Sequence, residues 1–156
     1  MIRFVVILCT TLTFACAPST DQNAQKQKLN VETTFAQICA ETLGVDYRRI
    51  RVVHGQTDRI DHGVGAHASR ATVLTGSAVH VAAGNLRAKA LRAAASLLQQ
   101  PVAALRLVDG IVRADAGTAI ALADIVPHMT VGSPLLDGGP PGLTAEGRFD
   151  TEHMTY

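Results

Sequence analysis

The chain has 156 residues, of which 47% are hydrophobic, 17% charged and 4% aromatic, and its net charge is +1. This composition excludes disorder of the whole chain, because enough apolar surface is present to form a core. The near-zero net charge and the lack of tryptophan give no basis for binding nucleic acid or an anionic membrane surface. The three cysteines follow no zinc-ligand or disulfide spacing, so no metal site is expected from them.

Residues 1–30 differ in character from residues 31–156, and we expect a signal-like apolar segment followed by a polar linker. Arg3 precedes an uncharged apolar run, and small residues follow it, which is the pattern of an export signal. The run is shorter than the about 20 apolar residues that span a membrane. The five residues that end at Cys16 resemble a bacterial lipoprotein cleavage box, which would make Cys16 a lipidated membrane anchor. The alternative is a leader that is not native to the domain that follows.

The spacing of apolar residues predicts a first helix over about 31–44, ending at Gly44. Its apolar stripe consists of Phe35, Ile38, Cys39 and Leu43. Cys39 is expected to be an inert buried thiol, as free cysteines usually are. A strand is predicted next, from Arg48 to His54, because three of its residues are β-branched.

A long alanine-rich helix is predicted over about 69–99, with Ser69 as its N-cap. Arg87, Lys89 and Arg92 give this helix a polar side, which we interpret as a solvated face. Gly76 and Gly84 would allow another element to approach closely.

The second half of the chain predicts a small sheet and a loop rich in glycine and proline. Asp109-Gly110 between two apolar runs, 105–108 and 111–114, predicts a hairpin. Further elements are expected as a strand at 118–120, a short helix at 122–128, a Gly/Pro-rich loop after Gly132 and a last strand within 142–150. The predicted fold class is α+β, with two main helices packed on a small mixed or antiparallel sheet.

The run from Gly63 to Thr72 is the best candidate for a ligand site. Small residues and a serine hydroxyl stand where the long helix begins, and the first backbone N–H groups of a helix have no partner within it. The helix dipole also favours an anion there, so a phosphate-bearing ligand is expected. By spacing alone the run could be only a strand-to-helix connection, because a lone Gly-x-Gly is a weak signal. The nearby Asp58, Asp61 and His62 are interpreted as a polar loop and not as a metal cluster.

Four blocks of sequence, in order and at the right spacing, resemble the large, molybdopterin-binding subunit of the xanthine dehydrogenase family. That family includes aldehyde oxidases and aerobic carbon monoxide dehydrogenases. The resemblance covers about Val31 to Tyr156, and its blocks are 32–38 with 43–44, 51–58, 63–72 and 76–79. It implies a molybdenum ion held by a molybdopterin, often as the cytosine dinucleotide, with iron–sulfur and FAD subunits or domains as partners.

The resemblance also implies which residues bind the cofactor. The positions that match the family's glycine-rich cofactor loop are Gly65, Ala66, His67, Ala68, Ser69 and Arg70. Small side chains would let the backbone approach the pterin, and N–H groups and the Ser69 hydroxyl would donate to its oxygens. At position 67 the family has an aromatic or a small residue, so His67 departs from its pattern.

Two larger departures shape the expected function. The family's Gly-Gln-Gly stretch is replaced by Lys28-Leu29-Asn30-Val31, and its catalytic glutamate cannot be assigned to Glu146 or Glu152. No catalytic residue is therefore assigned, and the chain is expected to be an inactive fragment of a molybdenum hydroxylase subunit. The alternative is an exported lipoprotein or interaction domain without chemistry. The family is cytoplasmic, whereas a working signal in residues 1–16 would place the chain in the periplasm or on a membrane.

Overall fold

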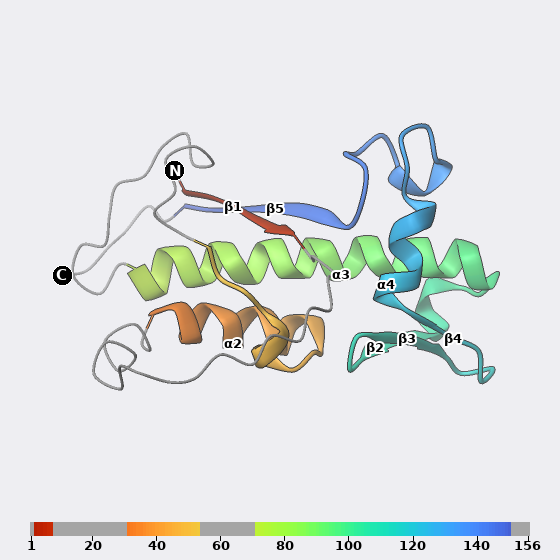
Figure 1. Cartoon of the computed structure of the whole chain (residues 1–156), viewed down its shortest axis with the longest axis horizontal. Helices are drawn as coiled ribbons and strands as arrows, with labels where there is room; N and C mark the ends of the chain where they lie inside the picture. Colours follow the sequence, from red (N-terminus) through yellow and green to blue (C-terminus); the bar gives the residue numbers. More distant parts are fainter. Residues whose placement is uncertain (1, 8–30, 54–70, 151–156) are drawn as a thin grey trace, which may run out of the picture.

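The computed structural model describes residues 2–7, 31–53 and 71–150. The longest element is α3 (Gly76–Leu98), which follows a π-helical turn, Ala71–Thr75. It runs along the whole molecule and lies beside α2 (Val31–Leu43) (Figure 1). The first helix matches its predicted range, the helical backbone predicted over about 69–99 is described from Ala71 to Leu98, and the predicted N-cap, Ser69, lies outside the described residues. The α+β class is confirmed. None of the helices in the described ranges is long and apolar enough to cross a membrane.

The end of α2 is fixed by a glycine. Gly44 has φ +65°, the Val45 amide donates to the Ala40 carbonyl at 3.0 Å, and the Gly44 amide donates to the Glu41 carbonyl at 3.3 Å. This pair of bonds is a Schellman motif, which satisfies the last carbonyls of a helix. Gly44 therefore stops α2 where the sequence predicted.

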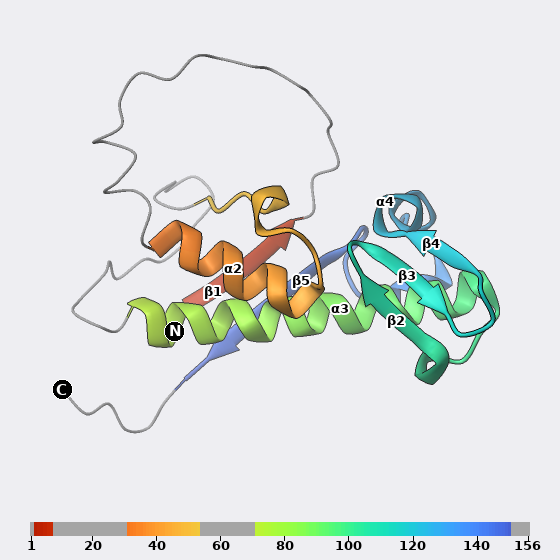
Figure 2. The same ribbon diagram turned by 90° about the horizontal axis from the view of Figure 1, so that it is seen from below.

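Three different groups of elements pack against α3. Its neighbours are α2, the strand pair of β1 (Ile2–Ile7) and β5 (Thr144–Phe149), and the unit formed by α4 (Leu122–Ile125) and the three-stranded sheet (Figure 2). The side chains that α3 buries are mostly small: Ala78, Val79, Ala82, Ala83, Leu86, Ala90, Ala93 and Ala94. Because alanine adds little bulk, several elements can approach the axis of one helix closely. The core is accordingly mostly aliphatic, with Phe35 as its buried aromatic residue among those described.

The three-stranded sheet consists of β2 (Leu105–Val108), β3 (Ile111–Ala114) and β4 (Ala119–Ala121), all antiparallel. Asp109 and Gly110 both have positive φ, 52° and 76°, as a two-residue type I′ turn requires. Alternate residues of the hairpin are buried, so one face of the sheet covers the core. The predicted hairpin is confirmed.

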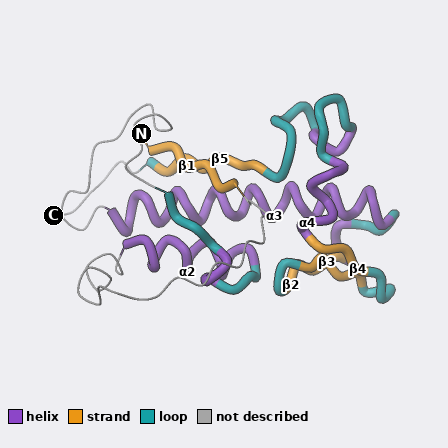
Figure 3. The backbone as a smooth tube through the Cα atoms, viewed as in Figure 1, coloured by secondary structure: helices purple, strands orange, loops and turns teal. Residues whose placement is uncertain are grey.

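The chain then forms α4 (Leu122–Ile125), which continues as a 3-10 turn through His128, and the predicted Gly/Pro-rich loop (Figure 3). The last strand, β5 (Thr144–Phe149), pairs antiparallel with β1 (Ile2–Ile7). The register runs from Ile2 opposite Phe149 to Ile7 opposite Thr144. Part of the segment that the sequence assigned to a leader thus forms a strand against the domain.

The strand predicted from Arg48 to His54 is wrong over its described residues. Tyr47–Arg49 form a 3-10 turn, capped by the Asp46 carboxylate, which accepts from the Arg48 amide at 2.9 Å. Ile50 is extended and packs against the core, but no strand of the described chain pairs with residues 50–53. A β-branched run favours extended backbone, whereas a ladder also needs a partner strand.

Candidate functional site

The residues predicted to bind cofactor, Gly65 to Arg70, lie outside the described part of the chain. The same holds for Cys16, and for the polar loop with Asp58, Asp61 and His62. The structure does describe the helices that flank this segment in the sequence. The geometry of the site is therefore described from those helices.

The two main helices begin at the same end of the molecule. Val31 of α2 and Gly76 of α3 start there, and the axes run in the same direction (Figures 1 and 2). Thr75, which precedes α3, is itself helical, with φ −72° and ψ −40°, so α3 is continuous with the turn Ala71–Thr75 at this end. Because the N-terminus of a helix carries partial positive charge, two parallel helices favour a negatively charged group at this end.

A shallow groove of about 430 Å³ lies beside the first turns of α2. Its lining residues are Glu32, Thr33, Ala36, Tyr47, Arg48, Ile50, Arg51 and Val52. The Arg48 guanidinium lies 3.6 Å from the Asp46 carboxylate and 5.9 Å from the centre of the Tyr47 ring. Since the Arg48 side chain is 77% exposed, solvent screens this ion pair strongly. The groove thus carries the exposed guanidinium groups of Arg48 and Arg51, together with the Glu32 carboxylate, along one side of α2.

Among the described residues, no group of three His, Cys, Asp or Glu side chains is placed to hold a metal ion. Any metal at this end would therefore need ligands from outside the described residues or from a cofactor.

A polar stripe on α3, defined as Asn85, Lys89 and Arg92, makes contacts with residues 137–146 that were not predicted from the sequence. Asn85 Nδ2 donates to the Glu146 carbonyl at 2.9 Å, and Arg92 Nε lies 3.2 Å from the Asp137 carboxylate. Lys89 Nζ donates to the carbonyls of Pro140, Gly142 and Thr144 at 2.9, 2.8 and 3.3 Å. The interpretation of Lys89 as part of a solvated face is therefore wrong. The residues recur at i, i+4 and i+7, and so share one face of the helix.

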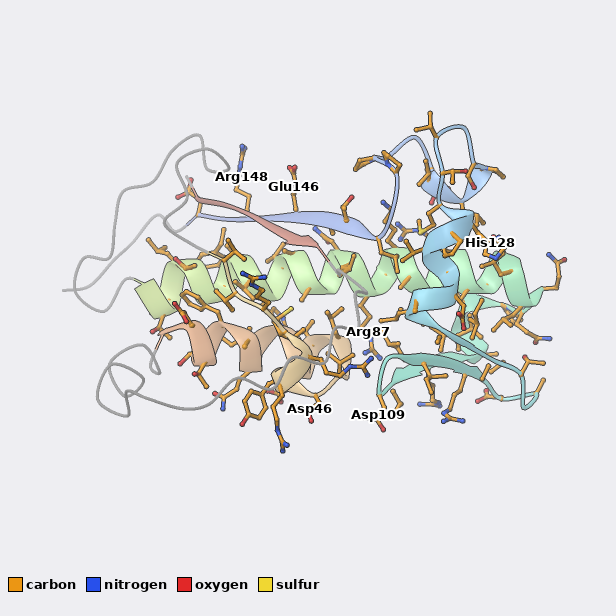
Figure 4. The ribbon with its side chains drawn as sticks, viewed as in Figure 1. Asp46, Arg87, Asp109, His128, Glu146 and Arg148 are labelled. Atoms are coloured by element: carbon orange, nitrogen blue, oxygen red, sulfur yellow. The ribbon has the colours of Figure 1, made fainter. Side chains whose placement is uncertain are left out.

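Arg87 was also expected on a solvated face, and this too is wrong. Its Nη1 donates to the Thr42 carbonyl at 3.2 Å and to the Leu107 carbonyl at 3.5 Å. Figure 4 shows Arg87 pointing from α3 toward the region where α2 ends and β2 passes. Charge favours this position, because the last carbonyls of a helix attract a cation. Arg87 joins α2 to the three-stranded sheet.

Cys39 is buried, as predicted, with 3% of its surface exposed. Burial raises the pKa of its thiol from 9.0 to about 11. At neutral pH the group is a neutral thiol packed in the core, and it is neither a nucleophile nor a thiolate ligand.

The raised pKa of Cys39 predicts a loss of stability in alkali. The folded protein retains the thiol proton up to about pH 11, whereas the unfolded chain loses it near 9.0. Stability from this group is therefore complete below pH 9 and falls by on the order of 2 kcal/mol as the pH rises toward 11. Urea unfolding of the wild type and of Cys39→Ala between pH 7 and 11 measures it. The two curves should converge with rising pH, and a constant separation would contradict the assignment.

The chain was compared with known proteins. The model of a family described as "Molybdopterin cofactor-binding domain" matches residues 29–156. Subunit gamma of the 6-hydroxypseudooxynicotine dehydrogenase complex of Paenarthrobacter nicotinovorans is 35% identical over 128 residues, which cover 81% of this chain and 16% of that protein. The carbon monoxide dehydrogenase large chain of Hydrogenophaga pseudoflava is 35% identical over 127 residues, 80% of this chain and 16% of that protein.

A solved structure gives the same result. The reconstituted CO dehydrogenase from Oligotropha carboxidovorans superposes with a TM-score of 0.66 at 31% identity, over 80% of this chain and 16% of that chain. The present chain thus spans about 16% of the length of these relatives. The family match covers both main helices and the sequence between them.

Proposed function

This chain belongs to the molybdopterin cofactor-binding domains of the xanthine dehydrogenase family, and from this premise we propose that it supplies one part of the cofactor site of a molybdenum-dependent oxidoreductase subunit. The match over residues 29–156 is the observation that carries the proposal. When bound, the cofactor supplies the oxygen-atom chemistry, and the protein binds and orients it. We assign only binding and orientation to this chain.

The described residues fit a phosphate-bearing group. The parallel N-termini of α2 and α3 favour negative charge, and Arg48 and Arg51 add guanidinium groups beside α2. We propose that Gly65, Ala66 and Ala68 let the backbone approach the pterin and its phosphate. His67, Ser69 and Arg70 would contribute amide, hydroxyl and guanidinium donors.

The activity of a whole subunit is proposed at the level of the family. Such a subunit would hydroxylate an aldehyde or an N-heterocycle, or oxidise carbon monoxide, and the pterin would be molybdopterin or its cytosine dinucleotide. Electrons would pass to iron–sulfur and FAD partners. No residue of this chain is assigned as the catalytic base, so we expect the chain alone to turn over no substrate.

Replacement of Gly65 by valine should lower the pterin content of the purified chain. A branched side chain would hold the backbone away from the cofactor, and losing one or two hydrogen bonds to an anion corresponds to roughly tenfold in affinity. The 156-residue chain would be produced in a host that makes molybdopterin. Molybdenum would be measured by mass spectrometry, and pterin by fluorescence after oxidation.

Gly84→Ala is the matched control, because it lies within α3 with no atom within 4 Å of an added Cβ. The proposal expects a pterin content that falls in Gly65→Val and is unchanged in Gly84→Ala. Equal pterin in both variants, or none in the wild type, would contradict cofactor binding by this chain. Turnover by the purified wild type, with molybdenum near one per chain, would contradict its expected inactivity.

The alternative function is an exported lipoprotein anchored through Cys16, and it requires that the N-terminal segment be cleaved off. Cleavage before Cys16 would remove residues 2–7, which pair with β5 in the structure. The purified wild-type chain therefore tests both hypotheses, the lipoprotein and the retained N-terminal strand. Labelled lipid that is incorporated by the wild type and lost in Cys16→Ser would support the lipoprotein, whereas an unprocessed N-terminus in the wild type would support the strand.

A further inference from the structure

The ammonium group of Lys89 lies among three backbone carbonyls. The Nζ distances to the oxygens of Pro140, Gly142 and Thr144 are 2.9, 2.8 and 3.3 Å. An ammonium has three N–H donors and no acceptor, so three carbonyls satisfy it completely. Each bond involves a charged donor, which makes it stronger than a bond between neutral groups.

The three acceptors belong to one stretch of chain, in which Leu143 is buried in the core and Thr144 pairs with Ile7 of β1. They occur at every second residue, from the Gly/Pro-rich loop to the first residue of β5. The other contacts of this stretch include the Gly142 amide, which donates to the Met129 carbonyl at 2.8 Å, and the exposed Arg92–Asp137 pair. The hydroxyl of Thr144 is buried without a hydrogen-bond partner. A polar, main-chain-lined site thus stands where the loop becomes a strand.

We propose that the carbonyls of Pro140, Gly142 and Thr144 form a binding site for a primary ammonium group, that Lys89 fills this site from α3, and that its occupation orders residues 137–144 and seats β5 on the helix. Burial and the neighbouring Arg92 lower the pKa of Lys89, as expected for a cation drawn out of water. The site is independent of the cofactor function. It is formed by main-chain oxygens, so it does not depend on the side chains of the loop.

Removal of Lys89 should loosen this stretch locally, and a free amine should restore it. In Lys89→Ala, hydrogen exchange of the peptide covering 137–144 should accelerate by roughly tenfold, because charged hydrogen bonds are lost. Alanine preserves helix propensity, so α3 is retained. Added n-propylammonium should reverse the acceleration, whereas tetramethylammonium, which has no N–H donor, should not. Exchange of the hairpin 105–114 reports global stability in the same experiment.

Two further variants sharpen the result. Lys89→Arg keeps the charge but presents a planar group that cannot direct three N–H donors to one set of oxygens, so exchange should still accelerate. Arg106→Ala removes an equal charge from the exposed side of β2 and should leave exchange at 137–144 unchanged. Wild-type exchange in Lys89→Ala, equal rescue by both salts, or equal acceleration in the hairpin would each overturn the proposal.

Discussion

Gly147→Ala is expected to destabilise the protein by about 3 kcal/mol and to lower its melting temperature by roughly 10 °C. A Cβ at this position would overlap the Ala78 carbonyl oxygen and the Ala82 amide nitrogen, and would lie 2.8 Å from the Ala82 Cα. These are backbone atoms of a long helix, so no side-chain rotation can relieve the overlap. The strand and the helix must separate, and the contacts along β5 are then lost together.

The matched control for Gly147 is Gly84→Ala in α3. Nothing lies within 4 Å of a Cβ added at Gly84, and alanine in place of glycine stabilises a helix interior by about 1 kcal/mol. Thermal and urea unfolding of the two variants should therefore move in opposite directions from the wild type. If Gly147→Ala unfolds within about 0.5 kcal/mol of the wild type, β5 does not lie against α3 as described.

The elements that local sequence determines were predicted well. The stripe from Phe35 to Leu43 places α2, and Gly44 ends it through its left-handed backbone. Asp109-Gly110 defines the hairpin, because both residues accept positive φ in a type I′ turn. In each case a few residues that are neighbours in the sequence determine the local structure.

The wrong predictions concern residues whose interaction partner is distant in the sequence and is not marked by any residue type. The β-branched residues of the run from Arg48 to His54 predict a strand, but a β-ladder also depends on a neighbouring strand that the run itself does not specify. Lys89 and Arg87 looked like solvent-facing cations, yet they donate to backbone carbonyls up to 55 residues away. Every residue has a carbonyl, so no pattern of residue types marks the acceptors. The predicted loop 65–70 depends on family resemblance, and the described residues include only the helices that flank it in the sequence.

The geometry assigns α3 a double role. Its first turns stand at the end where α2 also begins, and where we propose the cofactor binds (Figure 1). Farther along, the polar stripe of Asn85, Lys89 and Arg92 holds the chain from Asp137 to Glu146. Figure 4 shows Glu146 and Arg148 pointing away from the helix, so β5 meets α3 through its other face. One helix thereby links the proposed binding end to the packing of the C-terminal half.

Gly44→Ala is expected to destabilise the protein by about 2–3 kcal/mol, because two independent costs add. A φ of +65° disfavours any residue with a Cβ, by about 1 kcal/mol or more. The added Cβ would also lie 2.9 Å from the Leu107 carbonyl oxygen, which accepts from Arg87. The variant therefore strains the end of α2 and pushes on β2 at the point where Arg87 joins them.

Gly117→Ala separates these two costs. Gly117 has φ +88°, but nothing lies within 4 Å of a Cβ built on it. The free energy of unfolding of this variant should fall only by the conformational cost, about 1 kcal/mol. The difference between the two variants then measures the cost of the contact with Leu107. Urea unfolding at neutral pH gives both values. Equal losses in Gly44→Ala and Gly117→Ala would mean that α2 and β2 are not in contact there, and that Arg87 bridges a looser junction.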